Sequence, residues 1–340
     1  MQQNSISEFG SSSFVKPGAV GSLLLFWSML IGWGCEETIK DKIKATESGD
    51  KETQYSLGRC YLSLSQRVAG AALDWLMIAA NHGSPIAQRT MGECFEIGIG
   101  VPKDLTQAIL WYERASEGGD SEATMHLGVI YSKVGPKKNP ERAYACFRKA
   151  AETGNSEAQF RTGSCLLYGN GVQENPREAF NWFLKSSASK NSKAQFALGE
   201  CYQYGNGTEQ DQEKSFYWYR MAADQGDCEA LFNIGVRYDY GIGTIEDRVK
   251  AFECYKQASE RGHVESQYHL GFAYANGRGV VKNNIMAYVW LDVAAQEGFR
   301  TASEYLARVA ELMSPDDIAE AKKLVLPLKD KLAAASITSP

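Results

Sequence analysis

The sequence predicts an all-α fold, a right-handed α-solenoid (superhelix) of about seven antiparallel helix-pair repeats of ~36 residues with capping helices. One glycine recurs at intervals of 34, 36, 35, 36, 36 and 36 residues. A fixed pattern of small and large residues surrounds each copy, and a helix-capping residue follows it. Such repeats form a solenoid because no single one can bury its apolar face without its neighbours. The anchor glycines are Gly58, Gly92, Gly128, Gly163, Gly199, Gly235 and Gly271.

The first helix of each repeat is predicted around its anchor glycine. A small residue lies five positions before the anchor and a large residue three positions after it, which places both on one helical face. The small residues allow a second helix to approach closely, and the large ones fill the gap. The small residues are Thr53, Ala87, Ala123, Ala158, Ala194, Ala230 and Ser266, and the large ones are Tyr61, Phe95, Tyr131, Leu166, Tyr202, Tyr238 and Tyr274.

The second helix of each repeat is predicted from its capping residues. Side-chain oxygens that can accept from free amides of the first turn recur at Asp104, Asn139, Asn175, Asp211, Asp247 and Asn283. The shared interior position holds Trp75, Trp111, Cys146, Trp182, Trp218, Cys254 and Trp290. The helices should end at left-handed glycines, namely Gly83, Gly119, Gly154, Gly226, Gly262 and Gly298. The fourth repeat has Lys190 at this position.

Pairs of glycines, as in the two copies of YGNG at 168–171 and 204–207, pose the question of a phosphate-binding loop. Such a loop requires a strand before it and a helix after it. Here the pairs lie between the two helices of a repeat, so we expect interhelical turns. The pairs are Gly98/Gly100, Gly169/Gly171, Gly205/Gly207, Gly241/Gly243 and Gly277/Gly279.

The segment AQFALGECYQYGNGTEQDQEKSFYWYRMAADQG, residues 194–226, resembles the bacterial type of the Sel-one-like repeat family, relatives of tetratricopeptide repeats. The resemblance covers about residues 50–313 and departs from the family pattern in two interhelical loops, at 63–70 and at Gly135-Pro136. It implies a scaffold that binds proteins or peptides, with the first helices lining the inner curve.

Residues 1–35 are expected to be a secretory leader. The apolar run AVGSLLLFWSMLIGWGC at 19–35 is broken by glycines and short for a membrane span, and Gly32-Trp33-Gly34 could be a cleavage site. The mature protein would then be exported, either periplasmic or secreted. A retained membrane anchor, a start at Met29 and a lipid-modified Cys35 remain alternatives.

The expected order after the leader is an N-terminal capping helix at 36–49, then the solenoid at 50–313, with seven repeats and a final half repeat. Residues 314–340 should form a C-terminal capping helix that starts after Ser314 and runs through roughly Leu332, followed by a loose tail.

Composition argues against several classes of function. The net charge of −5, without a basic excess, argues against nucleic-acid binding. Four histidines without a Cys-x-x-Cys motif predict no metal site, and we expect no cofactor. His126 and His269 share one repeat position, which favours a structural role at the surface.

The eight cysteines should be mostly free thiols. Cys60, Cys94, Cys165 and Cys201 occupy equivalent positions of different repeats, about 10 Å apart between neighbours, beyond the roughly 7 Å limit for a disulfide. One bridge stays open: Cys146 and Cys165 lie on antiparallel helices at similar distances from Gly154.

An enzyme hypothesis comes from the family resemblance, because some cysteine-rich relatives are described as binding or hydrolysing β-lactams. Ser187-Ala188-Ser189-Lys190 matches Ser-x-x-Lys, and Tyr204-Gly205-Asn206 imitates Tyr-x-Asn. The latter belongs to a turn that recurs at Tyr168-Gly169-Asn170, and Ser-Asp-Asn and Lys-Thr-Gly motifs are missing. We therefore expect a non-catalytic protein and keep β-lactam binding or hydrolysis as the alternative.

The candidate binding surface is one face of the first helices, at the positions three before, one after and five after each anchor glycine. Aromatic side chains on it could anchor a protein or peptide partner. Alternatively, Phe160, Phe196, Phe232 and Tyr268 only pack against the neighbouring repeat. We expect a monomer, and the sequence does not name the partner. The candidate residues are Phe160, Tyr168, Phe196, Tyr204, Phe232, Tyr240, Tyr268 and Phe272, with Ser164, Glu200 and Val236 between them.

Overall fold

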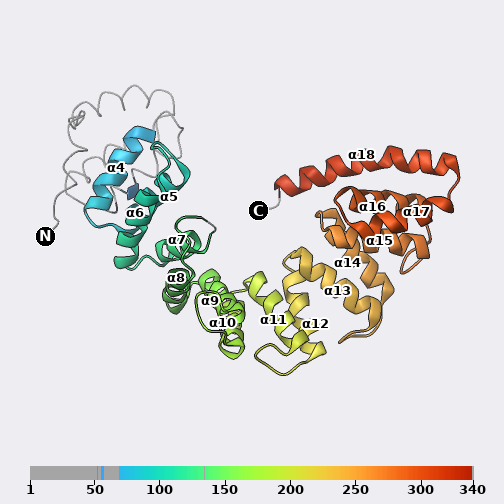
Figure 1. Ribbon diagram of the computed structural model, residues 1–340, viewed down its shortest axis with the longest axis horizontal. Coiled ribbons are helices and arrows are strands. Elements are labelled where there is room, and N and C mark those ends of the chain that lie inside the picture. Colours follow the sequence, from blue (N-terminus) through green and yellow to red (C-terminus); the bar gives the residue numbers. More distant parts are fainter. Residues whose placement is uncertain (1–51, 53–54, 57–68, 134, 339–340) are drawn as a thin grey trace, which may run out of the picture. The chain divides into compact units, whose positions relative to one another are not determined.

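The computed structural model describes residues 52, 55–56, 69–133 and 135–338. These residues form fifteen helices and no strand (Figure 1). The chain divides into two compact parts, Met1–Leu127 and Gly128–Pro340. The predicted all-α fold of repeated helix pairs is confirmed.

The N-terminal part contains α4 (Ala69–Asn81), α5 (Pro85–Ile97) and α6 (Leu105–Glu117), and α7 (Ser121–Ser132) begins in it. Helices α5 and α6 are the first and second helices of repeat two. The core of this part brings together Leu76 and Ala79 of α4, Met91 of α5 and Trp111 of α6.

The C-terminal part continues the alternation of first and second helices (Figure 1). From α9 on, the second helix of each repeat packs against both its own first helix and the first helix of the next repeat. The last two helices, α17 and α18, pack against α16, and α17 is the predicted half repeat. The helices are α8 (Pro140–Glu152), α9 (Ser156–Tyr168), α10 (Pro176–Ala188), α11 (Ser192–Tyr204), α12 (Gln212–Ala223), α13 (Cys228–Tyr240), α14 (Arg248–Glu260), α15 (Val264–Asn276), α16 (Asn284–Gln296), α17 (Arg300–Glu311) and α18 (Pro315–Thr338).

The capping residues lie where the sequence predicts them. Each of the six aspartates and asparagines is the N-cap of its second helix, and its side chain accepts a hydrogen bond from the first turn. In Asn175 the bond is reciprocal, because its Nδ2 also donates to Glu178 Oε2 at 3.2 Å. These bonds satisfy amides that have no partner within the helix.

Glycines with positive φ end the second helices, as predicted. Their φ values run from 81° at Gly83 to 96° at Gly154. Lys190 has the same left-handed conformation, with φ of 59°. Among the described residues, no other residue apart from glycines has a positive φ. The fourth repeat therefore keeps the turn and bears the steric cost of a side chain in the left-handed region.

The anchor glycines allow an aromatic ring of the second helix to contact the first helix. A Cβ at Gly199 would lie 2.7 Å from Cδ1 of Tyr219, and one at Gly163 would lie 2.6 Å from Cε1 of Phe183. Anchor glycines in the other described first helices meet Tyr112, Phe147, Tyr255 or Leu291 in the same way. The repeated glycine is thus a packing requirement between paired helices.

The glycine pairs are interhelical turns, as predicted, and the second glycine of each pair has a further contact. A Cβ at Gly171 would overlap the carbonyl oxygen of Pro140, the first residue of α8 in the preceding repeat. Gly207, Gly243 and Gly279 contact the first residues of α10, α12 and α14 in the same way. Each of these turns therefore rests on the preceding repeat.

The last helix is longer than predicted. Ser314 Oγ accepts from Asp317 N at 3.1 Å at its start, but α18 runs to Thr338 instead of ending near Leu332. Residues 333–338 are therefore helical and not a loose tail, because Lys331-Leu332-Ala333-Ala334-Ala335 favours helix and Leu332 packs against the core that includes α16. The expected leader at 1–35 and capping helix at 36–49 lie outside the described residues. Among those that are described, no helix is long and apolar enough to cross a membrane.

Candidate functional site

Three tyrosines of the predicted surface project into solvent. Tyr168, Tyr204 and Tyr240 are 63%, 64% and 59% exposed. They are the last residues of α9, α11 and α13, and a left-handed glycine follows each one. We call them the tyrosine row. They recur at 36-residue spacing in consecutive repeats of the C-terminal part, so their side chains leave equivalent points of three first helices.

The phenylalanines of the same surface are half-buried, and each packs against a ring of the second helix of its own repeat. Ring centroids lie 5.9 Å apart for Phe160 and Phe183, and 5.2 Å apart for Phe196 and Tyr219. Phe232 lies 6.2 Å from Tyr255 and also contacts His263 and His269. These distances are those of packed aromatic pairs, which supports a packing role for the three phenylalanines.

In repeat seven the aromatic surface is covered by the half repeat. The Tyr268 ring lies 5.3 Å from Phe299, and Phe272 lies 5.3 Å from Tyr305 of α17. Asn276, at the position of the tyrosine row, donates from Nδ2 to Tyr305 Oη at 2.7 Å. The exposed part of the predicted surface is therefore confined to α9, α11 and α13.

A buried polar layer supports the middle of the tyrosine row. Arg237 of α13 is 3% exposed, lies 4.5 Å above the Tyr219 ring and donates to Gln203 Oε1 and Ser215 Oγ, both at 2.9 Å. Tyr219 Oη donates to the same Gln203 oxygen at 2.8 Å. Burial lowers the pKa of Arg237, and its Nε has no hydrogen-bond partner in the described part of the chain. These bonds tie α11, α12 and α13 together beneath the surface.

The next repeat arranges the same positions differently. Asp239 replaces Gln203 and is one methylene shorter, and it accepts from Arg278 at 2.9 Å. The buried hydroxyl of Tyr255, equivalent to Tyr219, has no hydrogen-bond partner among the described residues. Arg278 also lies 5.7 Å from the Tyr240 ring, so a cation supports this exposed tyrosine.

His126 and His269 both stack on a tyrosine of the preceding second helix. Ring centroids are 4.9 Å apart for His126 and Tyr112, and 5.0 Å apart for His269 and Tyr255. Burial lowers the pKa of His269, ahead of smaller effects from nearby charges. Both histidines have a structural contact, and His126 keeps the predicted surface position while His269 is partly covered.

The cysteines bear on the disulfide alternative. Cys165 is a free thiol, so the bridge between Cys146 and Cys165 is absent. Burial raises the pKa of Cys201 to about 12 and that of Cys94 to about 11. In the residues that the structure covers, no group of three histidine, cysteine, aspartate or glutamate side chains could hold a metal.

The residues of the β-lactam alternative do not come together as a catalytic group. Ser187 is buried at the end of α10 and donates from Oγ to the carbonyl oxygen of Leu184 at 2.8 Å. Lys190 is exposed two residues after the helix, and the described contacts include no bond between its side chain and Ser187. A serine nucleophile requires a base within hydrogen-bond reach.

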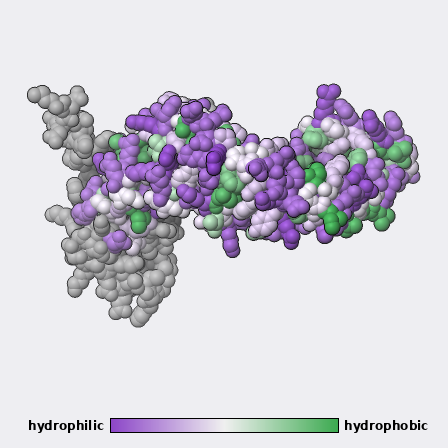
Figure 2. Space-filling view, turned by 90° about the horizontal axis from the view of Figure 1, so that it is seen from below, coloured by the Kyte–Doolittle hydropathy of each residue, from purple (hydrophilic) through white to green (hydrophobic). Residues whose placement is uncertain are grey.

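One face of the described molecule offers little continuous apolar area. On the face drawn in Figure 2, hydrophilic residues predominate and hydrophobic ones form small, separate patches. Isolated apolar residues of this kind are ordinary on a soluble surface.

Repeated helix pairs, their glycine anchors and an exposed side-chain row define an α-helical repeat protein. The profile of the Sel1 repeat matches residues 51–84, 85–120, 121–155, 156–191, 192–227, 228–263 and 264–299. The chain belongs to the Sel1 repeat family, as the sequence resemblance predicts.

Known proteins resemble parts of this chain. DAP3-binding cell death enhancer 1 of Rattus norvegicus is 28% identical over 141 residues, covering 30% of this chain and 28% of that protein. F-box protein At1g70590 of Arabidopsis thaliana is 35% identical over 103 residues, with the same two coverages. The chain thus spans less than a third of these relatives. A crystal structure of a Sel1 repeat protein from Oxalobacter formigenes matches 70% of this chain and 96% of its own, with a TM-score of 0.62 and 29% identity.

Proposed function

We propose that the protein is a non-catalytic scaffold that binds a protein or peptide partner through the tyrosine row of α9, α11 and α13. The observation that carries this proposal is the exposure of Tyr168, Tyr204 and Tyr240 at equivalent positions of consecutive repeats. Tyrosine is enriched at protein interfaces, since its ring supplies contact area and its hydroxyl remains able to hydrogen-bond. Membership of a helical repeat family supports a binding scaffold as well.

Alanine substitution of the whole tyrosine row tests this proposal. The full chain, its Tyr168→Ala/Tyr204→Ala/Tyr240→Ala variant and a control are used to capture proteins from the native source, with mass spectrometry as the readout. A suitable control is Leu184→Ala/Tyr217→Ala/Val249→Ala, because these residues are exposed on the second helices α10, α12 and α14. The tyrosine variant should lose the partners that the control retains.

The tyrosine variant should keep the stability of the unchanged chain, because the three tyrosines are more than half exposed, and the control should lose little more, because Leu184 at 37% exposure is its most buried site. Equal capture by the tyrosine variant and the unchanged chain would contradict this placement of the binding site.

We further propose export of the protein, with removal of residues 1–35. The supporting observation is the glycine-broken apolar run at 19–35 in the sequence. Amino-terminal sequencing from the native host should begin near Cys35. Recovery of the chain from Met1 in the cytosolic fraction would contradict the proposal.

A further inference from the structure

The half-buried carboxylate of Glu200 lies beside the tyrosine row and has no cationic partner among the described residues. Glu200 is one helical turn before Tyr204 on α11, and it raises the pKa of Tyr168 on the neighbouring first helix α9, after the effect of burial. In the described part of the chain, no hydrogen bond or ion pair reaches the Glu200 side chain. Burial, followed by the charge of Glu229, raises the pKa of Glu200 itself. A buried carboxylate in such a setting is expected to be paired.

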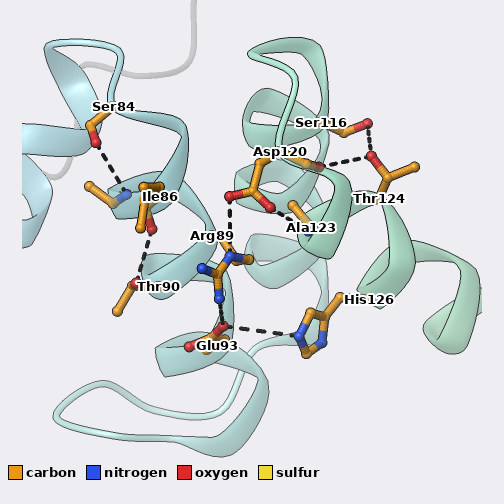
Figure 3. Close-up of polar contacts among 11 residues, drawn as sticks. Ser84, Ile86, Arg89, Thr90, Glu93, Ser116, Asp120, Ala123, Thr124 and His126 are labelled. Atoms are coloured by element: carbon orange, nitrogen blue, oxygen red, sulfur yellow. Dashed lines mark hydrogen bonds and ion pairs between the residues drawn. The ribbon is translucent and has the colours of Figure 1, made fainter. Parts of the chain in front are cut away.

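Repeat two shows how this chain satisfies a carboxylate at the same position. Glu93 is the equivalent of Glu200, one residue after the anchor glycine. Arg89 Nη1 donates to Glu93 Oε1 at 2.8 Å, and its Nε donates to Asp120 Oδ2 at 3.2 Å (Figure 3). His126 Nε2 lies 4.0 Å from Glu93 Oε1 on the other side. One guanidinium thus joins two carboxylates of this surface.

Repeat five keeps the carboxylates and lacks the cations. Asp227 stands at the position of Asp120, whereas Phe196 replaces Arg89 and Asn233 replaces His126. The Asn233 side chain donates to the backbone oxygen of Glu229 at 2.9 Å. Asp227 caps α13 through the amide of Ala230, and burial raises its pKa. The charge pattern that is complete in repeat two is therefore incomplete in repeat five.

The charged side chains around Glu200 do not supply the missing cation. Lys193 of α11 and Arg161 of α9 both pair with Glu157, at 3.8 and 2.8 Å. Arg237 lies under the surface on Tyr219, and Glu229 adds negative charge while it pairs with His263 at 3.3 Å. An unpaired carboxylate flanked by two exposed tyrosines is complementary to a cationic group, since cations bind to both carboxylates and aromatic faces.

We propose that the tyrosine row docks a peptide segment with an arginine side chain, whose guanidinium pairs with Glu200 between Tyr168 and Tyr204. This inference rests on the proposed binding function of the tyrosine row and adds the chemistry of the partner. Arginine fits better than lysine because its planar group can bond a carboxylate with two N–H donors and stack on a tyrosine ring at the same time.

Selection from a random dodecapeptide phage library on the full chain tests the proposal. The selected peptides should be enriched in arginine, and a synthetic labelled copy should bind in fluorescence anisotropy. Glu200→Gln, which keeps the shape of the side chain, should weaken this peptide by about tenfold or more, as expected for loss of one partner of a desolvated charge pair. Glu213→Gln on α12 makes the same change of net charge at an exposed site and should leave binding unchanged.

A second variant supplies the cation from within the protein. Asn233→Arg places a guanidinium at the position that His126 occupies in repeat two, so it should compete with the peptide and weaken binding as Glu200→Gln does. Raising the salt concentration should also weaken binding of the arginine peptide to the unchanged chain.

The outcomes separate the two proposals. If the library yields peptides without basic residues whose binding requires the tyrosine row, the scaffold function stands and the arginine inference is wrong. If the peptides are rich in arginine but Glu200→Gln binds them as well as the unchanged chain does, the inference is also wrong. If no peptide is selected, the arginine inference is wrong, and the capture experiment with the tyrosine variant decides the scaffold function.

Discussion

Replacing an anchor glycine by alanine should destabilise the protein even though alanine is the better helix former. In Gly199→Ala the new Cβ would lie 2.7 Å from Cδ1 of Tyr219, whereas carbon atoms in contact are normally about 3.5–4.0 Å apart. Tyr219 is 1% exposed, is covered by Arg237 and donates to Gln203, so its ring cannot retreat freely. Either the helices separate or the hydrogen bond is lost.

The size of the effect follows from three terms. Overpacking of a dense core typically costs about 1–3 kcal/mol, and loss of the hydrogen bond from Tyr219 adds about 1 kcal/mol. The gain in helix propensity from glycine to alanine is about 1 kcal/mol. The free energy of unfolding should therefore fall by about 1–3 kcal/mol, measured by urea denaturation followed by circular dichroism.

A double-mutant cycle isolates the clash. In a Tyr219→Ala background the obstructing ring is gone, so Gly199→Ala should be neutral or stabilising there. The reasoning would be refuted if Gly199→Ala were as stable as the unchanged chain, or if it had the same effect in both backgrounds.

Three further predictions concern Lys190, His269 and the buried thiols. Lys190→Gly should raise the free energy of unfolding by up to about 1 kcal/mol, since it removes a side chain from the left-handed region, and a lower urea midpoint would contradict the strain. The pKa of His269 lies below its ordinary 6.5 in the folded protein. The free energy of unfolding should therefore fall as the pH falls from 6.5 toward that lower pKa. The His269→Gln variant should lose less stability over the same pH range, measured by urea titration. The pKa values of Cys94 and Cys201 are raised to about 11 and about 12. Both thiols should therefore resist iodoacetamide in the native protein at about pH 8 and react after denaturation, measured by peptide mass spectrometry. Rapid labelling of the native protein would contradict their burial.

Features with a local cause could be predicted from the sequence. The N-cap of α12 depends on Asp211 and the next turn, and the left-handed end of α14 depends on Gly262. Capping rules of this kind involve only a few neighbouring residues. A sequence pattern that recurs at a fixed interval is therefore enough to locate the helices and their turns. The extent of α18 was underestimated because its end has no capping signal and depends on helix formers and on packing against α16.

Features that depend on neighbouring helices could not be predicted in this way. Phe196 and Tyr204 lie on one face of α11, yet only the structure shows that Phe196 packs against Tyr219 while Tyr204 remains exposed. Arg237 occupies a position where the other repeats have cysteine, isoleucine or alanine, and its burial requires acceptors from α11 and α12. The unpaired Glu200 could have been found by comparing repeats position by position, because Arg89 and Glu93 become Phe196 and Glu200.

The contact between each interhelical turn and the preceding repeat decides where this chain can accept extra residues. In repeats four to seven the second glycine of the turn comes eight residues after its anchor and rests on the preceding second helix, so a longer loop there would disturb two repeats at once. At the turns of Gly154, Gly262 and Gly298, no atom of the described residues would lie within 4 Å of an added Cβ. Tags, fluorescent domains or a second binding module should therefore be inserted between repeats, at these exposed glycines, although the glycine-rich loops within repeats look more flexible in sequence.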